Sequence, residues 1–356
     1  EELGFSGELE LGGNQLSGTL PAELRNTKVQ RIAMPNNRIS GTVPEAWRDL
    51  QITYLDLGHN QISGTLPAMF GEWPIVEIHI PGNQVSGSLP AALGRWVEMT
   101  TADFAGNQLV GDVPMWFMAS TINLANNQYT EFPETLKDCK GLVTLDLSGN
   151  PLRSWVSWIT HAENGREGNE KVEADMSMSS DAAAVAACQA GFSPTVSWPL
   201  LENVNVANTA LGQTQVTADV FLSSMSHLPN VRYVNAPNSG LSGVVTPEST
   251  RNHGPEDVAQ PMCGSFILAA DGYTRLVMMD LSSNRIERID GFSESAPFSR
   301  LDLKNNSLTF VATSVLDRRN TVVDLRNNPH LTLPIQPLDY ADRGCKDVPL
   351  RADSDR

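Results

Sequence analysis

Apolar positions recur along this chain at a fixed spacing instead of gathering in long runs. Residues 9–21 read L-x-L-x-x-N-x-L-x-G-x-L-P, in which the apolar letters alternate with polar ones and a Pro closes the unit. The same pattern, with conservative changes or with the Gly lost, returns at residues 32–44, 55–67, 78–90, 102–114, 122–127 and 145–150. Such self-similarity indicates a repeat architecture in which each unit packs against the next.

An Asn marks the same place in ten copies, and the ladder is Asn14, Asn37, Asn60, Asn83, Asn107, Asn127, Asn150, Asn284, Asn306 and Asn328. Neighbouring members are 20 to 24 residues apart within the first seven copies and 22 apart within the last three. Thr209 and Ser239 take this place in two weaker copies, since a short polar side chain suffices to bond backbone at a turn. The count is therefore twelve repeats.

The two apolar residues of each L-x-L alternate on a short strand, so both point to one side. Stacked strands predict an α/β repeat solenoid with a parallel sheet on its concave face and short helical or irregular segments, begun by Pro, on its convex face. Large residues three or six positions after each Pro are expected to fill the core, the tryptophans included; these are Leu24, Trp47, Leu50, Phe70, Trp73, Leu93, Trp96, Phe117 and Leu136.

The motif L-x-x-L-x-L-x-x-N-x-L-x-G-x-L-P resembles the plant-type leucine-rich-repeat family, a signature also found in protist surface proteins. Residues 8–116 match it closely, and residues 118–152 and 276–333 match the general repeat core. The resemblance implies a curved solenoid that binds ligands on its inner strand face and is usually secreted. It does not identify the ligand, and the chain holds no kinase segment or membrane anchor.

Two stretches depart from the repeat and divide the chain. We predict regular repeats over residues 1–152, an insertion over 153–200, less regular repeats over 201–340 with a loop insertion at 246–274, and a tail or cap over 341–356. The insertion is either a loop packed on the solenoid flank or a partner-binding arm. Because the chain begins inside repeat-like sequence without a recognisable cap, we expect a processed chain or a fragment.

The residue between the two apolar strand residues is predicted to face the concave side, and we name these twelve residues the strand-face column. The column comprises Glu10, Ala33, Asp56, His79, Asp103, Asn123, Asp146, Asn205, Asn235, Asp280, Asp302 and Asp324. Seven of its twelve members are acidic, and strands lie about 4.8 Å apart. The column is either the solvated face of a common L-D-L pattern or a surface for basic segments or bridging cations.

Composition and the absence of known motifs exclude several classes of partner and function. There are 41 acidic against 25 basic residues, a formal charge of −16, which argues against nucleic acid because phosphate binding needs a basic face. No stretch is suited to span a membrane. We find no nucleotide-binding loop, zinc-protease motif or nucleophile elbow, so we expect no catalysis and no cofactor or metal.

The four cysteines form no C-x-x-C pair, and three pairings are open to them. Cys139 falls at a core position, whereas Cys188, Cys263 and Cys345 lie in the insertions or the tail, and in a secreted chain we expect at least one disulfide involving Cys188 or Cys263. Asn305 begins the one glycosylation sequon, Asn305-Asn306-Ser307.

These observations favour an extracellular or cell-surface recognition or adhesion module that binds proteins, including basic segments, through the concave face and inserted loops. The alternative is a structural subunit of an extracellular assembly, such as a cell wall, appendage or filament, which binds copies of itself or other subunits. An enzyme or an enzyme inhibitor is a third, weaker interpretation.

Overall fold

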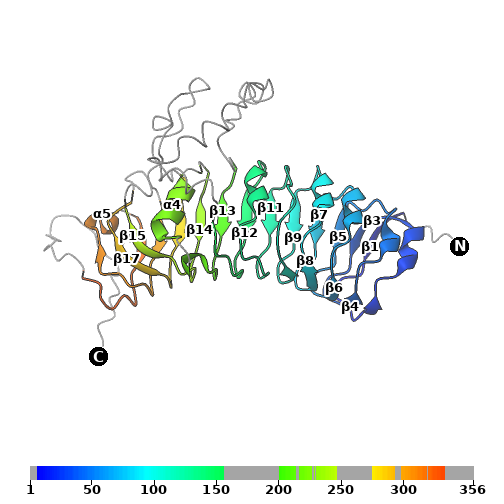
Figure 1. Cartoon of the computed structure of the whole chain (residues 1–356), viewed down its shortest axis with the longest axis horizontal. Helices are drawn as coiled ribbons and strands as arrows, with labels where there is room; N and C mark the ends of the chain where they lie inside the picture. The colour runs from blue at the N-terminus through cyan, green and yellow to red at the C-terminus, as the bar shows by residue number, and fades with distance from the viewer. Residues whose placement is uncertain are drawn as a thin grey trace, which may run out of the picture.

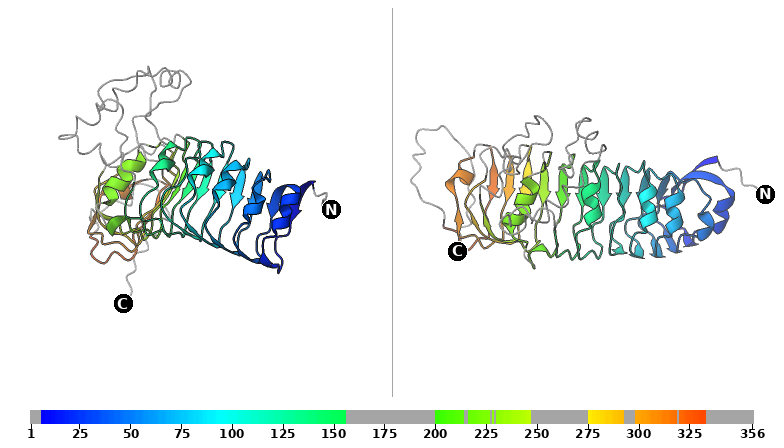
Figure 2. Two further views of the ribbon diagram at one scale, coloured as in Figure 1. Left: turned by 45° about the vertical axis from the view of Figure 1, so that its right-hand side comes forward. Right: turned by 45° about the horizontal axis from the view of Figure 1, so that its top comes forward.

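The protein is an elongated stack of repeats, seen side-on in Figure 1. The computed structural model describes residues 6–155, 200–246 (apart from 214, 215, 227 and 229), 275–292, 298–318 and 320–332. Figure 2 shows from two further sides that the repeats follow one another in chain order, from the blue N-terminal end to the orange C-terminal end. The shape follows from the sequence period, because each repeat contacts mainly its neighbours.

Twelve parallel strands, one from each repeat, form a single sheet in the described chain. In order they are β1 (Ser6–Glu10), β3 (Lys28–Ala33), β5 (Tyr54–Asp56), β7 (Glu77–His79), β9 (Thr101–Asp103), β11 (Thr121–Asn123), β12 (Thr144–Asp146), β13 (Asn203–Asn205), β14 (Tyr233–Asn235), β16 (Met278–Asp280), β18 (Arg300–Asp302) and β20 (Val322–Asp324). Leu55 and Leu57, the apolar pair of the third repeat, are fully buried beneath it. The predicted parallel sheet and the count of about twelve repeats are confirmed.

Two smaller parallel sheets follow the Asn turns, and the sequence pattern did not predict them. One contains β2 (Ser17–Thr19), β4 (Arg38–Gly41), β6 (Gln61–Gly64), β8 (Gln84–Gly87) and β10 (Gln108–Leu109), and the other β15 (Ser242–Val245), β17 (Arg285–Ile289) and β19 (Phe310–Val311). The Gly of the L-x-G motif ends each strand β4, β6 and β8 with φ between 76° and 78°. This left-handed conformation explains why glycine stands there.

Short helical segments occupy the remaining flank, as predicted. The 3-10 turns η1 (Ala22–Asn26), η2 (Glu45–Trp47), η3 (Ala68–Glu72), η4 (Ala91–Arg95) and η5 (Glu134–Asp138) each begin directly after a Pro. Later repeats use η6 (Leu211–Gln213) and the α-helices α4 (Ala218–Ser226) and α5 (Thr313–Leu316). Proline suits the start of a helical turn because its φ is preset and its missing N–H has no partner to lose.

The tryptophans fill the core between flank and sheet. Trp47, Trp73 and Trp96 are at most 2% exposed, and each indole N–H donates to a carbonyl of the preceding repeat, as from Trp96 Nε1 to Phe70 O at 2.8 Å. The prediction for Phe117 is wrong, because its side chain is 55% exposed and Trp116 is buried instead. In this short repeat the core position is set by its distance from the following strand and not from Pro114.

The two interruptions leave the main sheet intact. Strand β12 pairs directly with β13, and β14 with β16, although insertions separate them in sequence. Trp155 marks the start of the first insertion and links the two sides of it: its indole N–H donates to Ser224 Oγ of α4 at 2.8 Å, and its ring contacts Phe132 and Phe221. Residues 156–199 and 247–274 lie outside the described part, so the predicted boundaries stay predictions.

Candidate binding face

The strand-face column lies in register across the main sheet. Glu10 is opposite Ala33, Asp56 is opposite His79, and the pairing continues strand by strand to Asp302 and Asp324. The sheet therefore sets all twelve residues in one row along the length of the solenoid, as the strand arrows in Figure 1 run side by side.

Most members of the column close a turn with their own backbone. Asp56 Oδ1 accepts the N–H of Gly58 at 2.9 Å, two residues further along the chain, and Asp103 does the same with Ala105 at 3.0 Å. The same bond occurs at Asn123, Asp146, Asn205, Asp280, Asp302 and Asp324. The turn needs a short side-chain oxygen, so Asn serves as well as Asp.

Four members of the column lack this bond: Glu10, whose longer side chain accepts from Arg31 Nε instead, and three others that share one feature. Ala33, His79 and Asn235 make no such bond, and in each case the residue two positions later is a proline: Pro35, Pro81 and Pro237. Proline has no N–H to donate, so an acceptor in the column would gain nothing there. The geometry of the turn thus accounts for the Asp-or-Asn preference, but not for the choice of Asp over Asn.

Charge is neutralised at the C-terminal end of the column. Asp302 is only 2% exposed and lies 3.1 Å from Lys304 Nζ, with Arg300 at 3.8 Å. Asp324 accepts hydrogen bonds from Arg326, and these bonds hold the pKa of its carboxyl below the usual range. Asp302 was expected on the solvated face, and that expectation is wrong because the neighbouring cations cover it.

The middle of the column keeps its carboxylates open. Asp56, Asp103 and Asp146 are half-buried, and none forms an ion pair with a residue that the structure describes. Thr101 and Thr144, on the strands of Asp103 and Asp146, are too short to cover them. Asp146 Oδ2 accepts the amide of Asn205 at 2.9 Å, which continues to Asn235 at 2.8 Å, so amides replace charges from this point on.

The N-terminal end carries an aromatic and cationic network that sequence reasoning missed. Arg31 Nε donates to Glu10 Oε1 at 2.7 Å and its guanidinium lies 3.5 Å from the ring centre of Tyr54, whose ring is 5.6 Å from that of His79. The bond to Glu10 raises the pKa of Arg31, and burial raises that of Tyr54. Arg31, Tyr54 and Glu77 stand two positions before the column members of their strands, and that offset was the available signal.

The Asn ladder runs beside this face and joins the repeats. Asn60 Nδ2 donates to Met34 O of the preceding repeat at 2.8 Å, while its Oδ1 accepts the N–H of Ile39 at 3.0 Å. Asn37, Asn83, Asn107, Asn127, Asn150, Asn284 and Asn306 are buried in equivalent bonds. Asn328 is half-buried, and Asn14 is exposed and bonds only within its own turn. The ladder is placed to hold backbone together.

The remaining candidates are dispersed. Cys139 is buried and free, and burial raises the pKa of its thiol, whereas Cys188, Cys263 and Cys345 lie outside the described residues. Asn305 is exposed at φ 54° and its amide donates to Ser283 Oγ. Within the described ranges, no three His, Cys, Asp or Glu side chains gather as metal ligands. Nor does any helix in those ranges have the length and apolar character to cross a bilayer.

Comparison with known proteins identifies the repeat. The family model described as Leucine Rich Repeat matches residues 51–73. The leucine-rich-repeat ectodomain of the plant membrane receptor kinase GASSHO1/SCHENGEN3 from Arabidopsis thaliana is similar at a TM-score of 0.63 and 21% identity, over 91% of this chain and 35% of that one. No curated protein matches the sequence.

Two other plant structures share the fold. PEPR1, solved with AtPEP1, is similar at a TM-score of 0.61 and 19% identity, over 92% of this chain and 39% of that one. The plant peptide hormone receptor RGFR1, solved with RGF2, is similar at a TM-score of 0.50 and 16% identity, over 92% of this chain and 58% of that one. This chain therefore spans between 35% and 58% of these three structures. At these sequence identities the similarity shows a shared fold.

Proposed function

We propose that this leucine-rich-repeat chain, whose repeats resemble the plant-type class, is a non-catalytic recognition protein that binds a basic segment of another protein on its strand face. The contact would centre on Asp56, Asp103 and Asp146, with the network of Arg31 and Tyr54 at one end. Tyr and Arg are the residue types that most often anchor protein interfaces.

One observation carries the proposal: the column keeps unpaired carboxylates only where the chain supplies no cation of its own beside them. The turn would accept Asn at these positions, as it does at Asn123 and Asn205. The negative charge at Asp56, Asp103 and Asp146 is therefore not needed by the turn. It remains available to attract a cationic group of a partner. Two of the three acidic members at the other end are neutralised within the chain.

The spacing of these carboxylates suggests the form of the partner. Asp56, Asp103 and Asp146 stand on every second strand, with His79 and Asn123 between them. Two strand spacings amount to about 9.6 Å. A polyproline II segment brings every third side chain to the same edge after about 9.3 Å. A proline-rich segment with Lys or Arg at every third position would thus match the row when it lies along the solenoid axis.

The extracellular setting is part of the proposal. Two of the structures that share this fold are a receptor ectodomain and a peptide hormone receptor, and the GASSHO1/SCHENGEN3 ectodomain was solved in complex with CASPARIAN STRIP INTEGRITY FACTOR 2. We propose that this chain is likewise exposed at a cell surface, with Asn305 glycosylated. A loss of mass on glycosidase treatment of the protein from its native source, located at Asn305 by peptide mapping, is the expected result. An unmodified Asn305 would contradict that part.

The binding proposal can be tested with synthetic peptides. The probe is a proline-rich peptide with Lys at every third position, and the control has the same composition with the lysines consecutive. Asp→Asn at 56, 103 and 146 removes the charge and keeps the acceptor for the turn, so the fold is preserved. We expect the triple variant to bind the probe at least about tenfold more weakly, since rim and partly buried charges govern such contacts.

Asp324→Asn is the matched control, because that carboxylate is already paired with Arg326. It should bind the probe like the wild type. Equal affinity of the wild type for probe and control peptides would contradict the spacing argument. Full binding by the triple variant would contradict the proposed site.

A further inference from the structure

The fifth repeat exposes large apolar side chains in the segment between Pro114 and strand β11. Phe117, Met118 and Met115 are 55%, 54% and 49% exposed, and Val97 of the fourth repeat is 69% exposed. We name these four residues the apolar flank patch. Exposed apolar groups gathered in this way mark interaction surfaces in soluble proteins.

The patch is contiguous because the two repeats are in register. Thr101 pairs with Thr121 in the main sheet, and counting back from these residues places Val97 beside Phe117 and Trp96 beside Trp116. The two indole rings stack with 6.1 Å between their centres, which confirms the alignment of the two segments. The next repeat continues the register with Lys140 beside Phe117, because Thr121 pairs with Thr144, and Phe117 is still 55% exposed there.

The exposure has a structural cause. Asn107 and Asn127 are only 20 residues apart, and no 3-10 turn follows Pro114, whereas η4 and η5 follow the corresponding prolines of the adjacent repeats. The shortened segment buries Trp116 alone and turns Met115, Phe117 and Met118 outward. Packing of the core therefore does not explain why Met115, Phe117 and Met118, which all point outward, are apolar.

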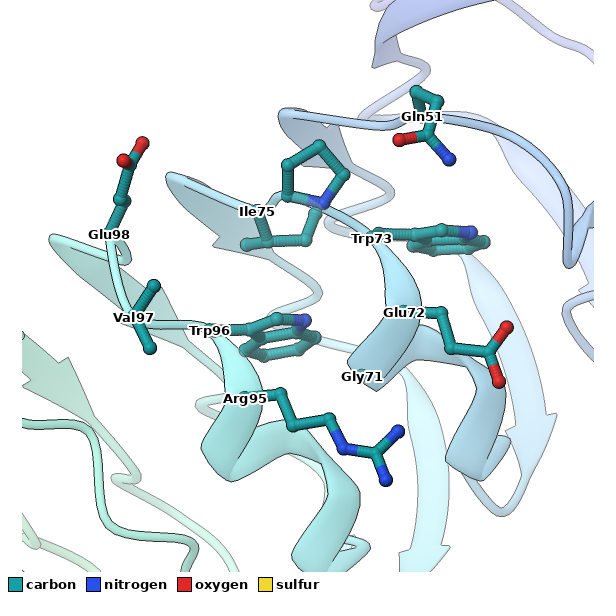
Figure 3. A pocket seen from close by; sticks show the side chains of 10 residues that line it. Gln51, Gly71, Glu72, Trp73, Ile75, Arg95, Trp96, Val97 and Glu98 are labelled. Carbon is teal, nitrogen blue, oxygen red and sulfur yellow. The ribbon is translucent and has the colours of Figure 1, made fainter.

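A hollow adjoins the patch and is flanked by charges of both signs. It has a volume of about 320 Å³, and its apolar lining includes Trp73, Ile75, Trp96 and Val97. Three charged residues line it as well: Glu72, Arg95 and Glu98. Figure 3 shows Arg95 and Glu98 extending in opposite directions from the backbone on either side of Val97. Neither forms an ion pair with any residue in the described ranges.

We infer that this patch is the contact surface for a second copy of the chain. In an interface with two-fold symmetry the same patch meets itself in reversed orientation, so Arg95 of one copy would face Glu98 of the other. The patch fits such a contact because charges of both signs border its apolar residues: Arg95, and the carboxylates Glu98 and Glu72.

The test is the size of the purified chain, measured by sedimentation velocity over about a hundredfold range of concentration. We expect a reversible monomer–dimer equilibrium, and Phe117→Asp should leave only monomer. Val322→Asp changes another exposed apolar residue, in the last described strand, and should dimerise like the wild type. Circular dichroism of each variant verifies that it is folded.

The charge pair gives a sharper measurement. Arg95→Glu and Glu98→Arg should each weaken dimerisation at least about tenfold, because each sets like charges against one another across the two-fold axis. The double reversal R95E/E98R should restore it. A wild type that stays monomeric throughout, or a double reversal as weak as the single ones, would overturn the inference. Binding of the lysine probe to Phe117→Asp is expected to be unchanged, so this test is independent of the proposed binding face.

Discussion

The N-terminal region (residues 6–155) and the C-terminal region (residues 200–332) share one sheet but differ on almost every other surface. In both, the strands continue the same register and an Asn, Ser or Thr bonds the turn. The N-terminal flank repeats proline-led 3-10 turns and a column of tryptophans, while the C-terminal flank uses the 3-10 turn η6 and the α-helices α4 and α5. The strand register and the polar residue at the turn are thus the same in both regions, whereas the segments on the flank differ.

The charges of the strand face follow the same division except at Asp280, a half-buried C-terminal member that forms no ion pair within the described residues. In the C-terminal region Asp302 and Asp324 each pair with a cation two residues further along the chain, so their charge is neutralised within the molecule. In the N-terminal region Asp56 and Asp103 have no such cation among the described residues. The comparison separates acids that stabilise the face from acids that are free to act on a partner.

The largest expected effect concerns the join between the two regions. Trp155→Ala should lower the free energy of unfolding by about 3–5 kcal/mol, because a buried indole packed on Phe132 and Phe221 is removed. Urea unfolding should also lose cooperativity, since the ring connects both regions. Trp155→Phe keeps most of the packing and serves as the control. A loss below about 1 kcal/mol in the Ala variant would show that the regions do not depend on this contact.

The ladder should matter more where it is buried. Asn60→Ala leaves Ile39 N–H and Met34 C=O without their partner, and at about 1–3 kcal/mol for each buried group the expected loss is about 3 kcal/mol. Asn14→Ala removes an exposed side chain that bonds only its own turn, and should cost less than about 1 kcal/mol. Equal losses at the two positions, measured by chemical unfolding, would refute an inter-repeat role for the ladder.

The C-terminal region should become more stable if its turn carries the Asn that the N-terminal repeats use. Thr209 Oγ1 donates only within its own repeat, to Val206 O at 2.9 Å. Thr209→Asn supplies an amide that can reach the preceding repeat as Asn60 does, and we expect a gain of about 1 kcal/mol. Thr209→Val is the matched control and should lose stability. A destabilised Asn variant would mean that the two regions differ in backbone at this turn.

A smaller effect, dependent on pH, is expected at Tyr129. Its hydroxyl is buried without a hydrogen-bond partner in the described structure, and burial raises the pKa of the phenol. Because the pKa of the phenol is higher in the folded than in the unfolded chain, the folded state loses stability as pH rises above the ordinary Tyr value of about 10. Below that pH the residue makes no pH-dependent contribution. Tyr129→Phe should gain up to about 1 kcal/mol at neutral pH and lack the alkaline loss at this residue. Identical alkaline profiles of the two proteins would contradict the assignment.

Much of this architecture could be read from the sequence, because apolar alternation and the spaced Asn reflect the sheet directly. The register of the strand-face column followed from the same period. Phe117 was misplaced since counting from Pro114 ignored the shorter repeat, and the smaller sheets were missed although the recurring Gly, as at Gly64, was visible. The burial of Asp302 and the stacking of Arg31 on Tyr54 depend on contacts between side chains, which no repeat pattern encodes.

The most direct test of the account is the salt dependence of binding to the lysine probe. The affinity of the wild type should fall steeply as salt is raised across the range in which the Debye length shrinks from about 30 Å to about 8 Å. The variant with Asn at 56, 103 and 146 should bind weakly with little salt dependence, and Asp324→Asn should follow the wild type. Binding of the probe to the wild type that is insensitive to salt would contradict recognition through the unpaired carboxylates of the strand face.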